Sequence, residues 1–537
     1  MEASGKTTAL ETMDMEGPKH LSGKWNCGDD DEMTRMGKVQ EFKVTMRIPL
    51  SSILEDFIAD QRNMRPLAAL SFASVLQATW EYLILSNYTG LEDGGLAGLF
   101  WSYIWTFIGF GFIIASLAEM ASMAPTDGGQ YHWVSEFCSP RHQKFLSYVT
   151  GWMSVLAWQA GTASGSFLTG TLIQGLITVR NPDYTAPGWQ GTLLVFSMVL
   201  VIYLFNVYAS ELMPVMSNLL MLFHIISWAV ILIMLWAMAP HRSARDVFVT
   251  DWKNIGGLPT MGVSVMVGQI SAIYGCLSSD ACAHMSEEIK DAGRNVPIAM
   301  YWGYFSNGIM AAILLVAYLF ATPSVEDSLD DASGFPLLYV FKQMTSTAGV
   351  NGLTAIIILP VIFSNIMFNA STSRQTWAFA RDKGLPFSNW ISKIDPKRKI
   401  PVNAIILSCV ISCLLSLINI GSSTAFNAII SLNTAALMFT YQISISCVIY
   451  RKIWYPDTLP ARRWDLGPLG LPINIIGVLY CFFAMFWSFW PTELPITAEN
   501  FNWSIVIFVA IFILSLVMYG LKGRKEYEGP VVEVKQS

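Results

Sequence analysis

Charged side chains are scarce in this 537-residue chain, and their scarcity excludes most classes of soluble protein. Asp, Glu, Lys and Arg make up 13% of the residues, against about 25% in an ordinary globular domain. Hydrophobic residues make up 53% and the mean hydropathy is +0.45. Several apolar runs approach the ~20 residues that a helix needs to cross a bilayer. The composition predicts an all-α protein embedded in a lipid bilayer, and the net charge of −6 gives no indication of a nucleic-acid partner.

The sequence also lacks the motifs of metal, cofactor and nucleotide chemistry. Its eight cysteines show no metal-ligand spacing, and most of them lie in apolar runs, so we expect them to be reduced and to pack as small apolar side chains. No GxxxxGK motif followed by Ser or Thr is present, which argues against ATP-driven transport within this chain. No nucleophile–base set is recognisable either. We therefore expect no metal, no cofactor and no enzymatic activity.

The order of polar and apolar segments predicts one membrane domain between two tails. The first sixty residues contain no apolar stretch, so we expect no cleavable signal peptide. Residues 1–64 are polar and predict a largely disordered tail, residues 65–520 the transmembrane domain, and residues 521–537 a second tail. The domain is predicted to contain twelve spans: 66–86, 96–118, 145–177, 189–209, 212–239, 259–284, 298–321, 351–380, 402–420, 425–450, 471–490 and 502–520.

The distribution of Lys and Arg predicts the side of the membrane that each end faces. With twelve spans both termini lie on one side, and 28 of the 33 Lys and Arg residues fall on that side. The other side keeps five: Arg180, Arg242, Arg245, Lys253 and Lys342. Because basic residues accumulate in cytoplasmic loops, both termini are predicted to be cytoplasmic.

The sixth predicted span has the pattern of a helix that is broken near its middle. An apolar helix runs into Tyr274, Gly275 and Ser278 and ends at an acidic residue, Asp280. Such a break is tolerated in a bilayer only where it is buried in protein or lines a cavity, and broken helices build the substrate sites of many transporters. A kinked structural helix is the alternative. Asp280 itself could recognise an amine or cap the restarting helix.

The first predicted span carries a carboxylate, Glu81, within an apolar helix. Ser74, Gln77 and Glu81 fall at i, i+3 and i+7, which is one face of a continuous helix. An intramembrane carboxylate costs at least a few kcal/mol unless it is paired or faces water. Glu81 is therefore a candidate for attracting a cationic substrate or for carrying a coupling proton, unless a neighbouring helix simply satisfies it. Trp80 beside it offers a cation–π face or packs within the bundle.

Further polar residues lie inside other predicted spans. His224 in the fifth span could relay a proton or be a hydrogen-bonded core histidine. Thr162 lies in a third span rich in Gly, Ser and Thr, where glycines four residues apart favour close helix packing. Asn365 and Asn369 of the eighth span and Asn427 of the tenth belong to stripes of polar residues. These amides either line the transport path or bond helix to helix.

Three segments carry a resemblance to a known family. They are SLAEMASMAPTDGGQYHW from Ser116, SSDACAHMSEEIKDAGRNVPIAM from Ser278, and TSRQTWAFARDKGLPFS from Thr372. In type and interval they resemble the fungal amino acid/choline transporter family, within the amino acid–polyamine–organocation superfamily. The likeness covers nearly all of residues 65–520 and is strongest to γ-aminobutyrate and choline permeases. The resemblance implies a leucine-transporter-like, five-plus-five inverted repeat with spans 1 and 6 broken, two extra spans, and proton-coupled uptake.

Carried over by motif, the resemblance also implies where the substrate binds. The first-span region from Gln77 to Glu81, which contains Thr79 and Trp80, would face the sixth-span break from Tyr274 to Asp280. The chain departs from better-known amino acid permeases in one respect, because its first-span break reads Ala-Thr-Trp-Glu and contains no Gly. Glu81, Asp280 and His224 are the candidates for proton coupling.

Together these observations predict a secondary active transporter that imports a small amine-bearing solute by alternating access. An amino acid, γ-aminobutyrate and choline are the expected substrates, with protons as the driving partner and a bilayer as the environment. A polyamine or other organic cation permease is one alternative. A nutrient sensor on the same fold is another, although the short tails favour a transporter. We expect it in the plasma membrane, with the vacuolar membrane as the other possibility.

Overall fold

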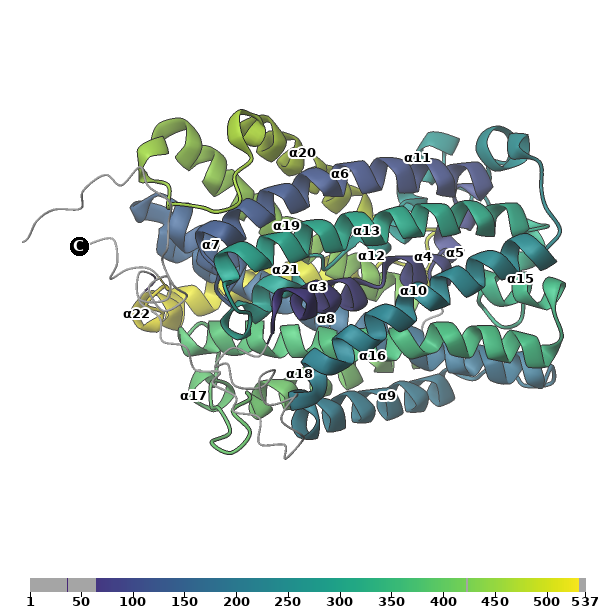
Figure 1. The fold of residues 1–537 in the computed structure, drawn as a ribbon, viewed down its shortest axis with the longest axis horizontal. Helices are drawn as coiled ribbons and strands as arrows, with labels where there is room; N and C mark the ends of the chain where they lie inside the picture. Colours follow the sequence, from purple (N-terminus) through teal and green to yellow (C-terminus); the bar gives the residue numbers. More distant parts are fainter. Residues whose placement is uncertain (1–35, 37–63, 422–423, 531–537) are drawn as a thin grey trace, which may run out of the picture.

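The computed structural model describes residue 36, residues 64–421 and residues 424–530, and over these residues the chain is a bundle of helices without a β-strand (Figure 1). Most of the long helices run roughly along the long axis of the molecule. The all-α prediction is confirmed. Except for Met36 and Met64, the predicted N-terminal tail lies outside the described residues.

The helices alternate between long membrane-length segments and short connecting ones. They are α3 (Pro66–Gln77), α4 (Thr79–Leu85), α5 (Tyr88–Glu92), α6 (Gly95–Met123), α7 (Gln130–Phe137), α8 (Pro140–Arg180), α9 (Gly188–Tyr208), η1 (Ser210–Leu212), α10 (Met213–Met238), η2 (Asp246–Thr250), α11 (Met261–Gly268), α12 (Ile270–Cys276), η3 (Ala281–Glu288), α13 (Ala292–Ala321), α14 (Val325–Leu329), α15 (Pro336–Met344), α16 (Thr347–Arg381), α17 (Ser388–Ile391), α18 (Val402–Ser416), η4 (Leu417–Ile420), α19 (Ala425–Trp454), η5 (Pro456–Thr458), η6 (Gly467–Leu469), α20 (Gly470–Ser488), α21 (Ser504–Met518), η7 (Tyr519–Gly523) and α22 (Arg524–Glu526).

Eleven helical segments of the described chain are long and apolar enough to cross a membrane. They correspond to the predicted spans with one exception, the third, which is α8. At 41 residues α8 is long enough to cross, but its Gly, Ser, Thr and Gln residues lower its hydropathy. Except for the half-buried Thr171, those residues are buried inside the bundle. The chain is therefore a multi-pass membrane protein.

The first span is interrupted at Ala78, between α3 and α4. Ala78 is fully buried and has a φ of 41° and a ψ of 47°, the left-handed conformation that L-residues other than Gly seldom adopt. This turn redirects the chain, so the face predicted for a continuous helix through Ser74, Gln77 and Glu81 does not persist. Gln77 and Glu81 consequently point to different surroundings, as described below.

The sixth span is interrupted over residues 277–280, as its sequence predicts. The helix α12 ends at Cys276, and η3 resumes at Ala281 in a 3₁₀ conformation. Ser278 has a φ of 64° within the interruption. Both predicted breaks are therefore present, while the five-plus-five repeat implied by the resemblance stays a prediction.

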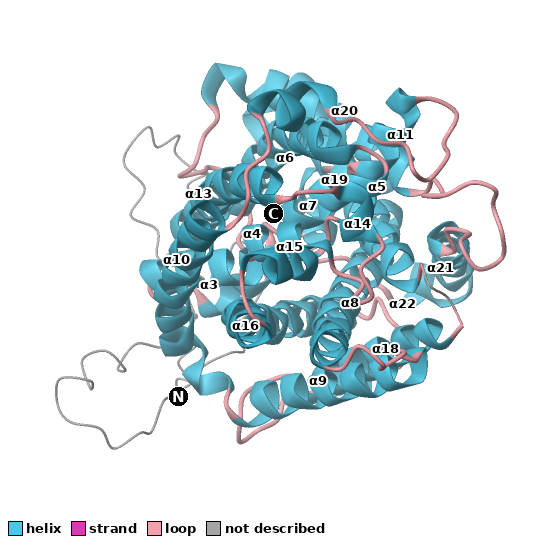
Figure 2. Cartoon of the chain, turned by 90° about the vertical axis from the view of Figure 1, so that its right-hand side faces the viewer, coloured by secondary structure: helices cyan, strands magenta, loops and turns pink. Residues whose placement is uncertain are grey.

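The peripheral helices present their apolar side chains outward. Seen end-on, α9, α18, α20 and α21 lie at the rim of the bundle, and α4, α8 and α16 lie nearer its middle (Figure 2). The rim helices carry many exposed large apolar residues, among them Leu204, Leu414, Leu479 and Ile513. Such a surface is stable in lipid and costly in water. The polar groups of the molecule are correspondingly gathered inside.

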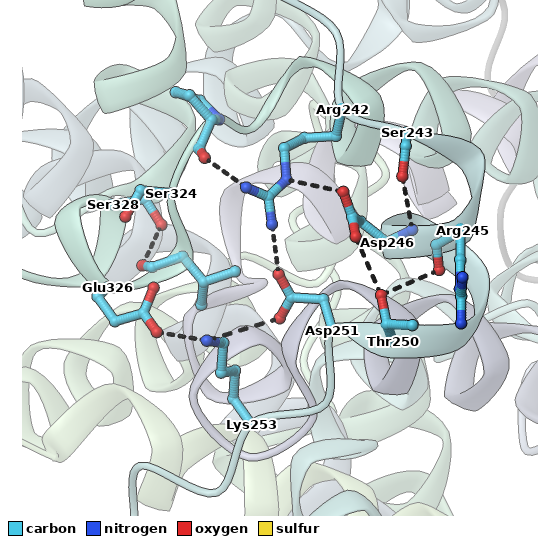
Figure 3. Close-up of polar contacts among 12 residues, drawn as sticks. Arg242, Ser243, Arg245, Asp246, Thr250, Asp251, Lys253, Ser324, Glu326 and Ser328 are labelled. Carbon is cyan, nitrogen blue, oxygen red and sulfur yellow. Dashed lines mark hydrogen bonds and ion pairs between the residues drawn. The ribbon is translucent and has the colours of Figure 1, made fainter.

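Ion pairs tie together the loops at the end of the bundle opposite α7. Arg242 lies 2.9 Å from Asp251, and Lys253 lies 2.5 Å from Glu326 on α14 (Figure 3). The hydrogen bond from Lys253 lowers the pKa of the Glu326 carboxyl, and the same bond raises the pKa of Lys253. The Lys253–Glu326 pair connects the segment before α11 to α14, and the Arg242–Asp251 pair lies within that segment.

Candidate functional site

A small cavity lies where the two broken spans meet near the middle of the bundle. Its lining residues come from α3, α4, α8, α12, α16 and α19 and from the sixth-span interruption. They are Leu76, Gln77, Tyr82, Gly161, Ser164, Tyr274, Leu277, Ser278, Phe368 and Asn433. The non-atom space within it is about 280 Å³ including open solvent, of which about 20 Å³ can hold the centre of a water molecule. In this conformation the central cavity therefore has room for about one water molecule.

The lining of this central cavity is polar but carries no charged side chain. Three of its polar atoms are buried and have no hydrogen-bond partner: Gln77 Nε2, Ser278 Oγ and Asn433 Oδ1. Gln77 Nε2 can only donate, Asn433 Oδ1 can only accept, and the Ser278 hydroxyl can do both. Buried polar groups are normally satisfied, so these three atoms point to a ligand or water as the missing partner.

Aromatic rings surround the same space. The Tyr82 and Tyr274 rings make an edge-to-face contact with centroids 5.3 Å apart, and the Tyr274 hydroxyl bonds to Ser164 Oγ at 3.0 Å. On the α16 side, the Phe368 ring lies so near Gly161 that a Cβ there would come within 2.4 Å of the ring. Aromatic faces attract cations, so the cavity offers three rings to an ammonium group.

A second, outer cavity lies beyond the Tyr274 ring. It has an empty volume of about 360 Å³ and is lined by Val267, Ile270, Thr424, Asn427, Ala428, Ser431, Trp487, Ser488, Trp490, Thr492, Asn500 and Asn502. The rings of Tyr274 and Phe426 are in edge contact at 5.8 Å. Because Tyr274 lines the central cavity and Asn427 next to Phe426 lines the outer one, this aromatic pair lies between the two.

Glu81 does not line the central cavity, because the turn at Ala78 directs it toward α10. Its Oε1 lies 2.7 Å from His224 Nδ1, and both side chains are fully buried. The Trp80 ring lies 5.7 Å from the imidazole. Glu81 Oε2, His224 Nε2 and Ser227 Oγ all lack a partner. The structure thus brings together two of the three predicted proton-coupling residues as one buried pair. Each of the two has one polar atom without a hydrogen-bond partner.

Asp280, the third of those residues, belongs to a separate network on the α7 side of the central cavity. It accepts hydrogen bonds from Gln130 Nε2 of α7 and from the Tyr441 hydroxyl of α19, the latter at 2.6 Å. His284 Nε2 lies 3.8 Å away. Both oxygens of Asp280 accept a hydrogen bond, so its carboxylate is satisfied inside the protein. In this conformation it joins α7 and α19 to the sixth-span interruption.

Ion pairs attach η3 to α16 just beyond this network. Arg381 lies 3.2 Å from Glu287, and Arg374 lies 2.9 Å from Glu288. Asp127, in the loop before α7, accepts a hydrogen bond from the Glu287 backbone N–H at 2.9 Å. Burial, with Glu287 nearby, raises the pKa of the Asp127 carboxyl well above its usual range. Charged groups thus link η3 to α16 and to the loop before α7.

The remaining predicted residues make contacts between helices. Thr79 Oγ1 has no partner, and its backbone carbonyl lies 3.2 Å from the Cβ position of Gly275, so α4 and α12 approach closely there. Thr162 bonds to Thr372 on α16 at 2.8 Å. Asn365 donates to Thr169 at 3.0 Å. The Asn369 amide is buried without a partner, and the lining of the central cavity does not include it.

Several lining residues were missed by the sequence analysis. Tyr82 and Phe368 are aromatic residues in apolar spans, a pattern that more often indicates core packing. Asn433 lies beside a polar stripe of the tenth span that includes Asn427, and Ser164 lies in the polar third span. Polarity inside a span could have found these last two. Among the described residues, no group of three His, Cys, Asp or Glu side chains could hold a metal ion.

Comparison with known proteins identifies the family. The family model described as amino acid permease matches residues 65–511. A Macrophomina phaseolina protein named as an amino acid/polyamine transporter is 27% identical over 81% of this chain and 96% of its own. The choline transporter of Saccharomyces cerevisiae is 26% identical over 84% of this chain and 80% of its own, and the amino-acid permease BAT1 of Arabidopsis thaliana is 27% identical over 87% and 92%. The chain therefore belongs to the amino acid permease family and is a membrane transporter, not an enzyme.

Proposed function

We propose that this permease imports a small solute with a single ammonium group, an amino acid such as γ-aminobutyrate or else choline, by proton-coupled alternating access. The observation that carries the proposal is the uncharged, partly unsatisfied cavity at two facing helix breaks. Broken helices of this kind bind substrate in secondary transporters. The relatives named for amino acids and choline support the same two substrate classes.

The helix ends at the breaks supply the charge that the lining side chains lack. The C-terminal ends of α3 and α12 both reach the cavity, at Gln77 and near Leu277. A helix C-terminus carries a partial negative charge and favours a cation. An ammonium group placed between these ends also meets the rings of Tyr82 and Tyr274. A zwitterion and choline both fit this arrangement.

The polyamine alternative is less well supported. A polyamine carries two or more separated positive charges, and buried charges need paired partners. No carboxylate lines the central cavity, since Glu81 faces His224 and Asp280 is held by Gln130 and Tyr441. A substrate with one ammonium group needs no such counter-charge beyond the helix ends.

The Glu81–His224 pair supports proton coupling. A carboxylate and an imidazole in hydrogen-bond contact can share or exchange a proton, and both carry an unpartnered atom through which the proton could arrive or leave. The pair joins α4, which follows the break beside the substrate cavity, to α10. Protonation of the pair would thereby alter the contact between the first and fifth spans.

Uptake by cells that lack their own carriers tests the proposal. Radiolabelled γ-aminobutyrate, a panel of amino acids, choline and a polyamine would be offered at several external pH values, with and without a protonophore. We expect uptake of a singly charged amine that rises as the external pH falls and is abolished by the protonophore. Uptake that follows sodium and ignores pH would contradict proton coupling. No uptake of any solute, with normal delivery to the membrane, would favour the sensor alternative.

A further inference from the structure

The last described part of the chain folds back onto the end of the bundle that carries α7. After α21 the chain turns through η7 and α22 and places Tyr527 in a fully buried position. The Tyr527 hydroxyl lies 2.7 Å from Ser147 Oγ of α8. Ser147 Oγ in turn donates to the backbone carbonyl of Tyr131 on α7 at 2.8 Å. One hydroxyl pair therefore joins the C-terminal segment to two different helices.

The Tyr527 ring packs against aromatic side chains of two helices, α8 and α16. It makes edge-to-face contacts with Tyr148 of α8 at 5.2 Å and with Phe379 of α16 at 5.8 Å. Phe379 also contacts Tyr131 of α7 at 5.1 Å. Tyr527 is therefore packed like a core side chain, with none of its surface exposed.

Polar contacts hold the backbone on either side of Tyr527. Lys144 donates to the Arg524 carbonyl at 3.0 Å, and Lys383 lies 2.9 Å from Glu528. At Gly523 a Cβ would come within 2.7 Å of the Tyr148 ring, so the segment approaches α8 as closely as a glycine permits. The segment is thus held at Gly523, Arg524, Tyr527 and Glu528, while the side chains of Lys525 and Glu526 are exposed.

The helices next to Tyr527 also contact the sixth-span interruption and η3. Tyr131 is adjacent to Gln130, which donates to Asp280 at the sixth-span interruption. The Tyr131 hydroxyl donates to Asp382 at 3.0 Å, and Asp382 follows Arg381, the partner of Glu287 on η3. The tail thus supports α7 and the end of α16 from one side, while these elements hold η3 from the other.

We propose that residues 524–528 form a latch that keeps this end of the permease closed, with Tyr527 as its anchor. Opening toward this end requires η3 to part from α7 and α16. As long as Tyr527 joins α7, α8 and α16, these elements stay in the closed arrangement. Release of Tyr527 loosens α7 and shifts the population toward the open state. The link between latch and transport rests on the proposed function, whereas the link between latch and closure does not.

A reversible cross-link tests the latch without disturbing its buried parts. Lys383→Cys and Glu528→Cys replace the two ends of an exposed ion pair, and a short bifunctional methanethiosulfonate would join them. We expect the cross-linked double variant to lose most of its uptake and to regain it when a reductant is added. Each single variant, treated identically, is the control. Full uptake with the tail cross-linked would overturn the proposal.

The accessibility of Cys282 provides a readout that needs no transport. Cys282 is a fully buried thiol on η3 and should be labelled only when this end opens. Tyr527→Ala should raise its labelling rate by a small thiol reagent about tenfold, and Tyr527→Phe, which keeps the ring, by much less. Tyr455→Ala, at a half-exposed tyrosine on the same end of the bundle, should have no effect.

Unchanged labelling in correctly inserted Tyr527→Ala protein would refute the latch, whatever the substrate proves to be. If Tyr527→Ala fails to insert, Tyr527→Phe and the cross-link still decide the question. If the protein transported no amine but Tyr527→Ala still raised the labelling rate of Cys282, the proposed function would be refuted and the latch would stand.

Discussion

Glu81 and Asp280, the acidic residues of the two broken spans, differ in how their oxygens are satisfied. Asp280 accepts a hydrogen bond on each oxygen, from Gln130 and from Tyr441, so neither oxygen is left without a partner. Glu81 has one oxygen near His224 and the other without a partner. An incompletely satisfied buried carboxylate is the better carrier for a proton that must arrive and leave. In the sequence both are acidic residues beside a break in a predicted span, so only their contacts in the structure distinguish their roles.

Glu81→Gln should therefore uncouple transport while leaving substrate binding largely intact. Glutamine nearly keeps the shape of the side chain and can still bond to His224, but it cannot exchange a proton. We expect pH-driven accumulation to be lost, and affinity in an exchange assay to change by less than about tenfold, or 1.4 kcal/mol. Uptake and exchange measured in the same vesicles check this. A hundredfold loss of affinity would instead assign Glu81 to the substrate.

Gln77→Ala should weaken binding without changing the pH response. Gln77 Nε2 is an unpartnered donor in the lining of the central cavity, and on the proposed function it would donate to a substrate oxygen. A neutral hydrogen bond contributes about 0.5–1.5 kcal/mol, so KM should rise about three- to tenfold. Gln190→Ala is the matched control, because Gln190 lies outside the cavity and bonds to Tyr184. Equal KM values for the two variants would remove Gln77 from the site.

At the scale of helices, the sequence predicted the breaks better than their consequences. Gly275 and Ser278 marked the sixth-span break, because both residue types weaken a helix. The first break contains no Gly, and an alanine in the left-handed conformation leaves no mark in a sequence. The prediction that Gln77 and Glu81 share one helix face was therefore wrong. The same limit applies to Phe368, whose place in the cavity depends on how α16 packs against α8.

Substitutions at Ala78 should show that the first break is strained. The left-handed conformation costs an L-residue about 1–2 kcal/mol, and Gly adopts it freely. Ala78→Gly should leave the free energy of unfolding unchanged or raise it by up to about 1 kcal/mol. The gain is limited because glycine also increases the conformational entropy of the unfolded chain. Ala78→Val, which adds bulk at a fully buried position, should lower the melting temperature in detergent. A destabilised Gly variant would mean that the Ala78 methyl group contributes more by packing than the turn costs.

At the scale of the whole molecule, both ends of the described membrane domain lie at the same end of the bundle, so one measurement fixes its orientation in the membrane. The chain enters the bundle at α3 and leaves it at α22 on the same end, the one that carries α7 and α17 (Figure 1). The ion-paired loops with Arg242 and Lys253 lie at the other end. Because basic residues accumulate on the cytoplasmic side and 28 of 33 are predicted on the side of the termini, both termini should be cytoplasmic.

Protease protection of terminal tags measures that orientation. Tags at either end should resist protease in intact cells and be cut after permeabilisation. A tag inserted after Asp330, in the loop that follows α14 at the opposite end, should behave in the reverse way and serve as the control. If both terminal tags were cut in intact cells, the chain would be inverted. The latch at Tyr527 would then close the outer end of the permease, and the network of Arg242, Asp251, Lys253 and Glu326 would face the cytoplasm.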